Sequence, residues 1–214
     1  MFILSTERNQ YDGLFYFLEI PKNPSNYLSL SPSLPLSLTP SLPHSLPLYL
    51  HTMNKTNILI REAEKSDISS IMELIYLKSE FDGCPESVQA TPQRLEVDLF
   101  GKQPLAFIIL GEIDRYPVGF ASYHFIYSTF LAKSGIWLDD LYVKAEYRNR
   151  RIGELLIQRL CKIAQEKDCA RIDWTVAKSN QLGIKFYQRM NAKIRQQTRL
   201  CRLDNQAISN NLNF

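Results

Sequence analysis

A proline-rich tract near the N-terminus divides this chain into two unequal parts. Residues 21–50 contain seven prolines, seven serines and nine leucines. Proline at this density removes backbone donors and interrupts helices, and the apolar residues keep neither the period of a strand nor that of a helix. The pattern predicts a disordered or polyproline-like segment, so regular secondary structure is expected only after it.

Met53 follows this tract almost directly, and the regular pattern begins just after it. We hypothesise that Met53 is the natural start and that residues 1–52 come from an upstream start assignment. A signal peptide is disfavoured, because proline and serine interrupt the apolar residues and no charged segment precedes a compact apolar block. N-terminal sequencing of the native protein would test the hypothesis, and a mature N-terminus at Met1 would contradict it. Residues 53–214 suit one domain.

The composition narrows the classes of function. The net charge of +3 comes from 25 basic and 22 acidic residues, a balance too mild to indicate nucleic-acid or membrane binding. No run of about 18 apolar residues is present, so no membrane-spanning helix is expected. The three histidines are scattered, and no metal site is expected. The four cysteines lack C-x-x-C spacing and are expected to be free thiols in a reducing cytoplasm: Cys84, Cys161, Cys169 and Cys201.

From residue 57 onward the pattern predicts alternating strands and helices. Ser66 is a candidate N-cap for a helix over 67–81, and Thr91-Pro92 is typical of the start of a second helix. The mixture of an antiparallel meander with one crossover predicts an α/β or α+β fold with a mixed sheet. The expected strands are 57–63, 106–112, 117–127, 135–143, 170–177 and part of 192–203, and the other expected helices are 152–168 and 181–190.

The junction between strand 135–143 and helix 152–168 predicts an anion site. A basic loop containing Arg148, Arg150 and Arg151 leads into the helix, and Gly153 lies at its opening. Backbone N–H groups at a helix N-terminus lack intrahelical partners, and the helix dipole adds positive charge there. A pyrophosphate would be well held, although a solvated basic loop remains an alternative on composition alone.

Two motifs in this region resemble the signatures of the GNAT acetyltransferases. The segment YRNRRIG is similar to their R/Q-x-x-G-x-G/A loop: Arg148 matches the first position, Gly153 the last, and Arg151 replaces the middle glycine. Asn180 followed by FYQRMNAK resembles their second signature. The resemblance covers roughly residues 57–204, and it implies a mixed, mostly antiparallel central sheet flanked by helices.

Two longer stretches resemble the spermidine/spermine and thialysine N-acetyltransferases within that family. They read VGFASYHFIYSTFLAKSGIWLDDLYV and ARIDWTVAKSNQLGIKFYQRMNA. The resemblance implies a homodimer that transfers acetyl from acetyl-CoA to a primary amine of a small cationic substrate by direct attack. A protein or peptide amine acetyltransferase and a non-catalytic acetyl-CoA-binding module are the alternatives.

The resemblance also assigns roles to individual residues. It implies that Tyr187 and Asp139 are catalytic and that Tyr187 also contacts the coenzyme. The remaining coenzyme-binding residues are Leu141, Tyr142, Val143, Arg148, Asn149, Arg150, Arg151, Ile152, Gly153, Glu154, Asn180, Gln181, Leu182 and Gly183. The substrate-binding residues are Phe81, Asp82, Asp139, Asp173, Trp174 and Thr175.

Acidic residues are the expected partners of a cationic substrate. Glu80, Asp82, Asp139 and Asp173 are candidates to line an acidic cleft. Adjacent strand residues point to opposite faces, so Asp139 and Asp140 cannot share a face without a bulge, and a structural hydrogen-bonding role is the alternative for Asp140.

Two further residues could have purely structural roles. Tyr187 could be a core aromatic residue, because its spacing from Ile184 places both on one helix face. Cys161 lies on a helix with an apolar inward face and is expected to pack there rather than to act as a nucleophile.

Overall fold

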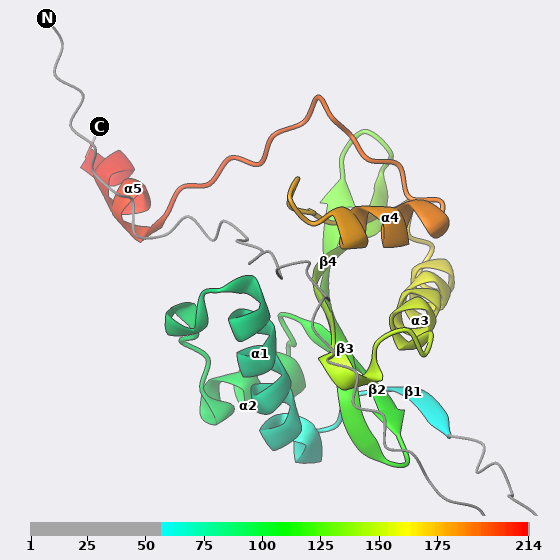
Figure 1. The fold of residues 1–214 in the computed structure, drawn as a ribbon. Coiled ribbons are helices and arrows are strands. Elements are labelled where there is room, and N and C mark those ends of the chain that lie inside the picture. Colours follow the sequence, from blue (N-terminus) through cyan, green and yellow to red (C-terminus); the bar gives the residue numbers. More distant parts are fainter. Residues whose placement is uncertain (1–56, 214) are drawn as a thin grey trace, which may run out of the picture. The chain divides into compact units, whose positions relative to one another are not determined.

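The computed structural model describes residues 57–213 (Figure 1). The predictions made for residues 1–52 and for Met53 lie outside this range. The described residues divide into two compact units, 57–173 and 174–213, and we describe each by itself.

The first unit is built on a five-stranded sheet with the order β1-β2-β3-β4-β5. Neighbouring strands are antiparallel except β4 and β5, which are parallel. This confirms the mixed, mostly antiparallel sheet. The strands are β1 (Ile58–Glu62), β2 (Phe107–Ile113), β3 (Tyr116–Ser128), β4 (Lys133–Val143) and β5 (Ile172–Asp173), and the α-helices are α1 (Ile68–Asp82), α2 (Pro92–Phe100) and α3 (Ile152–Glu166). Short 3₁₀ turns occupy Lys65–Asp67, Pro85–Ser87 and Ala145–Tyr147.

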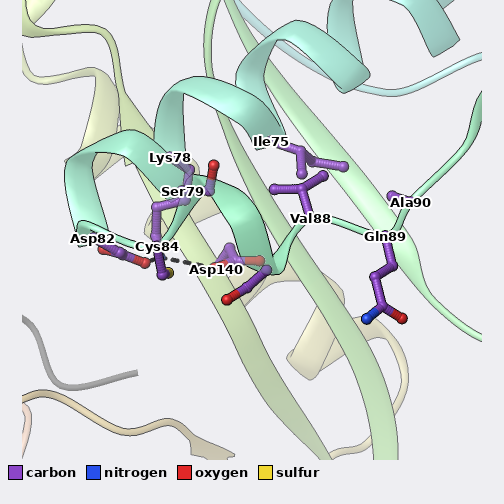
Figure 2. A pocket seen from close by; sticks show the side chains of 10 residues that line it. Ile75, Lys78, Ser79, Asp82, Cys84, Val88, Gln89, Ala90 and Asp140 are labelled. Carbon is purple, nitrogen blue, oxygen red and sulfur yellow. Dashed lines mark hydrogen bonds and ion pairs between the residues drawn. The ribbon is translucent and has the colours of Figure 1, made fainter. Parts of the chain in front are cut away.

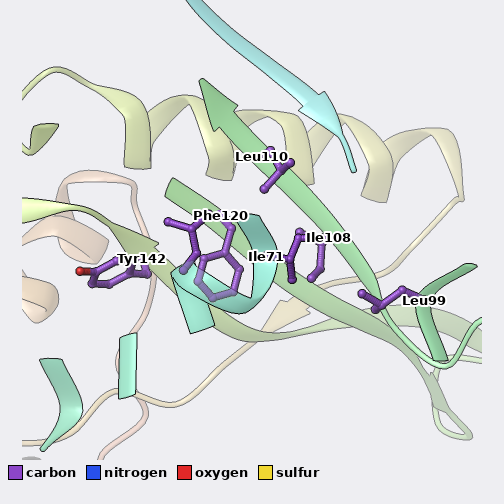
Figure 3. Packing of buried hydrophobic residues seen from close by; sticks show 7 residues of the cluster. Ile71, Leu99, Ile108, Leu110, Phe120 and Tyr142 are labelled. Carbon is purple, nitrogen blue, oxygen red and sulfur yellow. The ribbon is translucent and has the colours of Figure 1, made fainter. Parts of the chain in front are cut away.

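Helices cover both faces of this sheet (Figure 1). On the face of α1 and α2, buried side chains from the helices and from β2, β3 and β4 form one cluster, shown in Figure 3: Ile71, Leu74, Leu99, Ile108, Leu110, Phe120 and Tyr142. On the other face, α3 buries an apolar stripe that includes Ile152, Leu156 and Leu160. Gly111 of β2 lets α3 approach closely, because a Cβ atom at this position would lie 2.7 Å from Cγ2 of Ile152.

The starts of the two helices on the first face follow local sequence signals with one correction. Thr91 accepts a hydrogen bond from the backbone N–H of Arg94 and Pro92 begins α2, as predicted. The N-cap role predicted for Ser66 belongs instead to Glu64 and Asp67. The carboxylate of Asp67 accepts the N–H of Glu64 at 2.7 Å, so the chain enters a 3₁₀ turn before α1 begins.

Three other predictions need correction. The strand predicted at 170–177 shrinks to Ile172–Asp173, because its pairing with β4 covers only Ile136 and Trp137. Residues 192–203 form no strand in the described structure, and most of their side chains are exposed. Cys161 is exposed, because Leu160 and Ala164 take the inward positions of α3.

The second unit contains α4 (Gln181–Arg189) and α5 (Asn205–Asn210), followed by a 3₁₀ turn at Asn211–Asn213. The predicted helix 181–190 with its cap at Asn180 is confirmed, whereas α5 was not predicted. Across residues 57–213, every helix is too short or too polar to cross a bilayer.

Candidate functional site

Strand β4 carries a β-bulge at Asp139. Ser122 of β3 pairs with Asp140, and the next β3 residue, Tyr123, pairs with Leu138, so Asp139 has no partner on β3. Consecutive residues of β3 point to opposite faces, and therefore Leu138 and Asp140 also lie on opposite faces. A bulge is thus present beside the adjacent aspartates, and Asp139 is exposed at it.

The other edge of β4 is open over its second half. β5 pairs only with Ile136 and Trp137, so within residues 57–173 no strand pairs with that edge beyond Trp137. The N–H of Lys144 donates to the carbonyl of Val118 on the β3 side at 2.8 Å. Backbone groups alternate along a strand, so the amides of Leu141 and Val143 point away from β3. Both of these amides belong to the predicted coenzyme site.

The loop after β4 prepares the start of α3. Asn149 and Arg151 have φ angles of 62° and 66°, the left-handed region that favours glycine. Arg151 thus keeps the backbone conformation that a glycine would adopt easily. Arg151 is also the N-cap of α3, and its side chain makes no capping hydrogen bond. The first intrahelical hydrogen bond runs from the N–H of Leu155 to the carbonyl of Arg151. The amides of Ile152 and Gly153 therefore lack intrahelical acceptors and suit an anion.

Arg148 joins the predicted coenzyme loop to the predicted substrate residues. Its Nε donates to the carbonyl of Val143 at 3.0 Å. Its guanidinium lies 4.5 Å from the ring centroid of Phe81 and 5.8 Å from that of Tyr142. The two rings are 6.1 Å apart. Three segments that the sequence assigned to one site, namely the end of α1, the end of β4 and the basic loop, therefore meet here.

The loop arginines are held to different degrees. Arg151 forms an ion pair with Glu154 at 2.8 Å, one turn into α3. The guanidinium of Arg150 lies 5.5 Å from the ring centroid of Tyr147. All three arginines of the loop are exposed, so the positive charge predicted beside the start of α3 faces solvent.

A cleft of about 280 Å³ opens beside the C-terminal half of α1 (Figure 2). The ammonium of Lys78 lies between two carboxylates there. It pairs with Asp82 one turn further along α1, and with Oδ1 of Asp140 on β4 at 3.1 Å. The lining residues are Ile75, Lys78, Ser79, Asp82, Cys84, Ser87, Val88, Gln89, Ala90 and Asp140.

Burial and charge shift the pKa values in this cleft. Burial raises the pKa of Asp82, and the nearby charge of Asp140 adds to this effect, so the pKa stays above its usual value although Lys78 opposes the shift. Burial alone would lower the pKa of Lys78, but Asp140 and Asp82 outweigh it and raise the pKa. Oδ1 of Asp82 is buried and has no hydrogen-bond partner within the described structure.

The structure distributes the predicted acidic residues differently from the sequence reasoning. Of the four candidates for an acidic cleft, only Asp82 lines this one. Asp140 lines it as well and also exchanges hydrogen bonds with Ser122, at 3.1 and 3.3 Å, so it combines both roles. Asp139, at the bulge, and Glu80 are both exposed. Asp173 accepts a hydrogen bond from Nε of Arg171 at 2.6 Å.

Lys78 was missed by the sequence reasoning. Its spacing of four residues from Asp82 is a recognisable helical ion-pair signal. Its contact with Asp140 joins residues far apart in the chain and has no such signal.

The second unit holds the other predicted residues. Oδ1 of Asn180 accepts the N–H of Gly183 at 2.7 Å and caps α4. A Cβ atom at Gly183 would lie 2.6 to 2.8 Å from the Asn180 amide group, so the glycine makes room for the cap. Gln181 donates to the carbonyl of Lys178 at 2.7 Å, and Leu182 is exposed.

Tyr187 lies in an aromatic group within the same unit. Its ring centroid is 5.0 Å from that of Trp174 and 5.3 Å from that of Phe186. Thr175, next to Trp174, is exposed. The predicted catalytic tyrosine and one predicted substrate residue are therefore in contact.

Comparisons with known proteins point to one family. A sequence model of the acetyltransferase (GNAT) family matches residues 71–192. The thialysine N-epsilon-acetyltransferase of Sus scrofa is 31% identical over 145 residues, which cover 64% of this chain and 85% of that protein. The spermidine/spermine N(1)-acetyltransferase-like protein 1 of Homo sapiens is 30% identical over 135 residues, which cover 60% of this chain and 19% of that protein.

A solved structure supports the fold. An integron cassette protein from the mobile metagenome of V. cholerae has a TM-score of 0.62 and 22% identity, and the match covers 73% of this chain and 98% of that one.

Proposed function

Because the chain belongs to the GNAT acetyltransferase family and is an acyltransferase, we propose that it moves acetyl from acetyl-CoA to a primary amine of a small cationic substrate. The contact of Arg148 with Phe81, Tyr142 and Val143 carries this proposal, because it joins the expected coenzyme loop to the expected substrate segment. The names of the two relatives point to two kinds of cation, an amino acid and polyamines.

The residues present fit acetyl-CoA. Acetyl-CoA supplies the acetyl group as a thioester that an amine can attack directly. We assign its pyrophosphate to the amides of Ile152 and Gly153 at the start of α3, with the loop Asn149–Glu154 and Arg148 around them. We assign its acetyl–pantetheine arm to the main chain of Leu141, Tyr142 and Val143. Asn180, Gln181, Leu182 and Gly183 complete the proposed set.

The amine must lose a proton before it can attack. With a pKa of about 10.4, only about one amine in 2,500 is neutral at pH 7, which corresponds to ~4.6 kcal/mol. We propose that Asp139 accepts this proton, directly or through a water molecule. Support comes from its position at the bulge, where its carboxylate is exposed beside the open edge of β4.

The attack also creates charge on the thioester oxygen and on the leaving sulfur. We propose that the outward amides of Leu141 and Val143 donate hydrogen bonds to the developing oxyanion. We propose that Tyr187 donates a proton to the departing thiolate, and that Trp174 packs on its ring to orient it. Phe81, Asp82, Asp173 and Thr175 remain proposed substrate contacts.

Thiol release from acetyl-CoA by the purified full chain tests this proposal. The panel should contain diamines, polyamines, lysine, ornithine, thialysine and an N-terminal peptide. We expect turnover with at least one small amine and a rise in melting temperature with acetyl-CoA. A temperature rise without any turnover would favour a non-catalytic acetyl-CoA-binding module, and turnover of the peptide alone would favour a protein acetyltransferase. The homodimer implied by the resemblance also remains a prediction, which analytical ultracentrifugation would test.

A further inference from the structure

The acidic cleft contains a cation of the protein itself, the ammonium of Lys78. Lys78 is bound by Asp82 and Asp140, and all three side chains line the cleft (Figure 2). The side chains of Lys78 and Asp82 are 17% and 13% exposed, and that of Asp140 is 33% exposed, so all three are partly shielded from water. Charge pairs in such surroundings are stronger than pairs on an open surface.

The cation changes the charge that the cleft offers to a substrate. Two carboxylates alone would attract a dication, but with Lys78 between them the net formal charge is reduced to −1. A second substrate ammonium would have to compete with an ammonium that is tethered in place and therefore has a high effective concentration. A substrate carboxylate, in contrast, would find an ammonium with hydrogen-bond donors beside it.

Building on the proposed function, we propose that Lys78 determines substrate specificity by pairing with a substrate carboxylate and by disfavouring a second substrate ammonium that has no carboxylate beside it. The cleft then accepts an amine that carries a carboxylate and disfavours a diamine of equal length. Asp82 and Asp140 hold the Lys78 ammonium in the cleft wall. Oδ1 of Asp82, which has no hydrogen-bond partner within residues 57–213, is an acceptor that an incoming ammonium could use after a small rotation of the side chain.

Matched substrate pairs isolate this effect. Lysine and cadaverine differ only in the α-carboxylate, as do ornithine and putrescine. For each pair we measure kcat and KM with the full chain and its Lys78→Met variant. We expect the wild type to favour the amino acid, and the variant to lower the ratio of kcat/KM values, lysine over cadaverine, by about tenfold. The change should appear in KM rather than in kcat.

Three further variants separate charge from folding. Lys78→Arg keeps the positive charge and should keep most of the ratio. The double variant Lys78→Met/Asp82→Asn removes the lysine together with one carboxylate, so that Asp82 and Asp140 are not left as two adjacent negative charges. It should show the same loss of preference for lysine over cadaverine. Lys65→Met removes an exposed lysine that pairs with Glu96, and it should leave the ratio unchanged.

A binding measurement separates this proposal from the proposed function. Calorimetric titration with cadaverine and with lysine requires no turnover. Absence of turnover in every protein would refute the proposed function, while tighter cadaverine binding by Lys78→Met than by wild type would still support the role of Lys78. Equal binding ratios in wild type, Lys78→Met and the double variant would overturn it and leave Lys78 a structural ion pair.

Discussion

The close approach of α3 to the sheet makes Gly111→Ala a sharp test of how the candidate site is held. The new Cβ would lie 2.7 Å from Cγ2 of Ile152, inside van der Waals contact, and both residues are buried. Overpacking of this kind costs about 1–3 kcal/mol. Replacing glycine within a strand returns about 0.5–1 kcal/mol, so we expect a net loss of up to about 2.5 kcal/mol.

Equilibrium urea unfolding measures this loss, and a double-mutant cycle with Ile152→Ala tests its cause. Ile152→Ala alone should be destabilising, but it removes Cγ2, so the double variant should lose at least ~1 kcal/mol less than the sum of the single changes. Ile157→Ala on the same helix is the control, because Ile157 is not among the nearest neighbours of the new Cβ, and its effect should add within about 0.5 kcal/mol. Additivity of the Ile152 cycle would refute the reasoning.

Ile152 is also the first residue of α3, and its amide is one of those assigned to the pyrophosphate. Gly111→Ala should therefore weaken acetyl-CoA binding more than Ile157→Ala does. Calorimetric titration of the two variants under conditions where both are folded would measure this difference.

Three other predictions concern single groups. Tyr187→Phe should lower kcat about 100-fold with little change in acetyl-CoA affinity, by initial rates and calorimetry, and an unchanged kcat would remove the tyrosine from the acid role. Arg151→Val should destabilise the chain by about 1–2 kcal/mol in urea unfolding because a β-branched residue resists positive φ, whereas Arg151→Gly should not, and equal effects would contradict the backbone argument. Because the pKa of Asp82 is raised, the folded protein binds this proton more tightly than the unfolded chain does, and stability should fall as the pH rises from the ordinary carboxyl pKa to the raised one. Asp82→Asn should flatten that part of the curve of urea midpoint against pH. An unaltered slope would count against the raised pKa.

Local signals predicted the parts of the fold that depend on neighbouring residues. Thr91-Pro92 located the start of α2, and Asn180 located the start of α4, because a cap and the amide it binds are three residues apart. The strand predicted at 170–177 was too long, because strand propensity does not show how many residues a neighbouring strand pairs with. Pairing with β4 stops at Asp173, and that limit depends on the three-dimensional path of the chain.

The candidate site was predictable in its members more than in their arrangement. The adjacent aspartates showed that a bulge would be needed to bring both to one face, but only the register of β3 against β4 shows that Asp139 is the extra residue. Arg148 was expected to bind an anion, and its position over Phe81 could not be predicted, because that contact depends on how α1 packs on the sheet. The same is true of Lys78 and Asp140.

The bulge in β4 also separates what the sheet requires from what the proposed chemistry requires. Because Asp139 faces no residue of β3, the ladder could close without it, with Leu138 and Asp140 as direct neighbours opposite Tyr123 and Ser122. A chain shortened by that single codon would keep Tyr142 in its apolar cluster and lose the carboxylate that we assign to deprotonation. Insertion of one residue into an already paired strand is thus a route by which a stable fold of this kind can gain a reactive group.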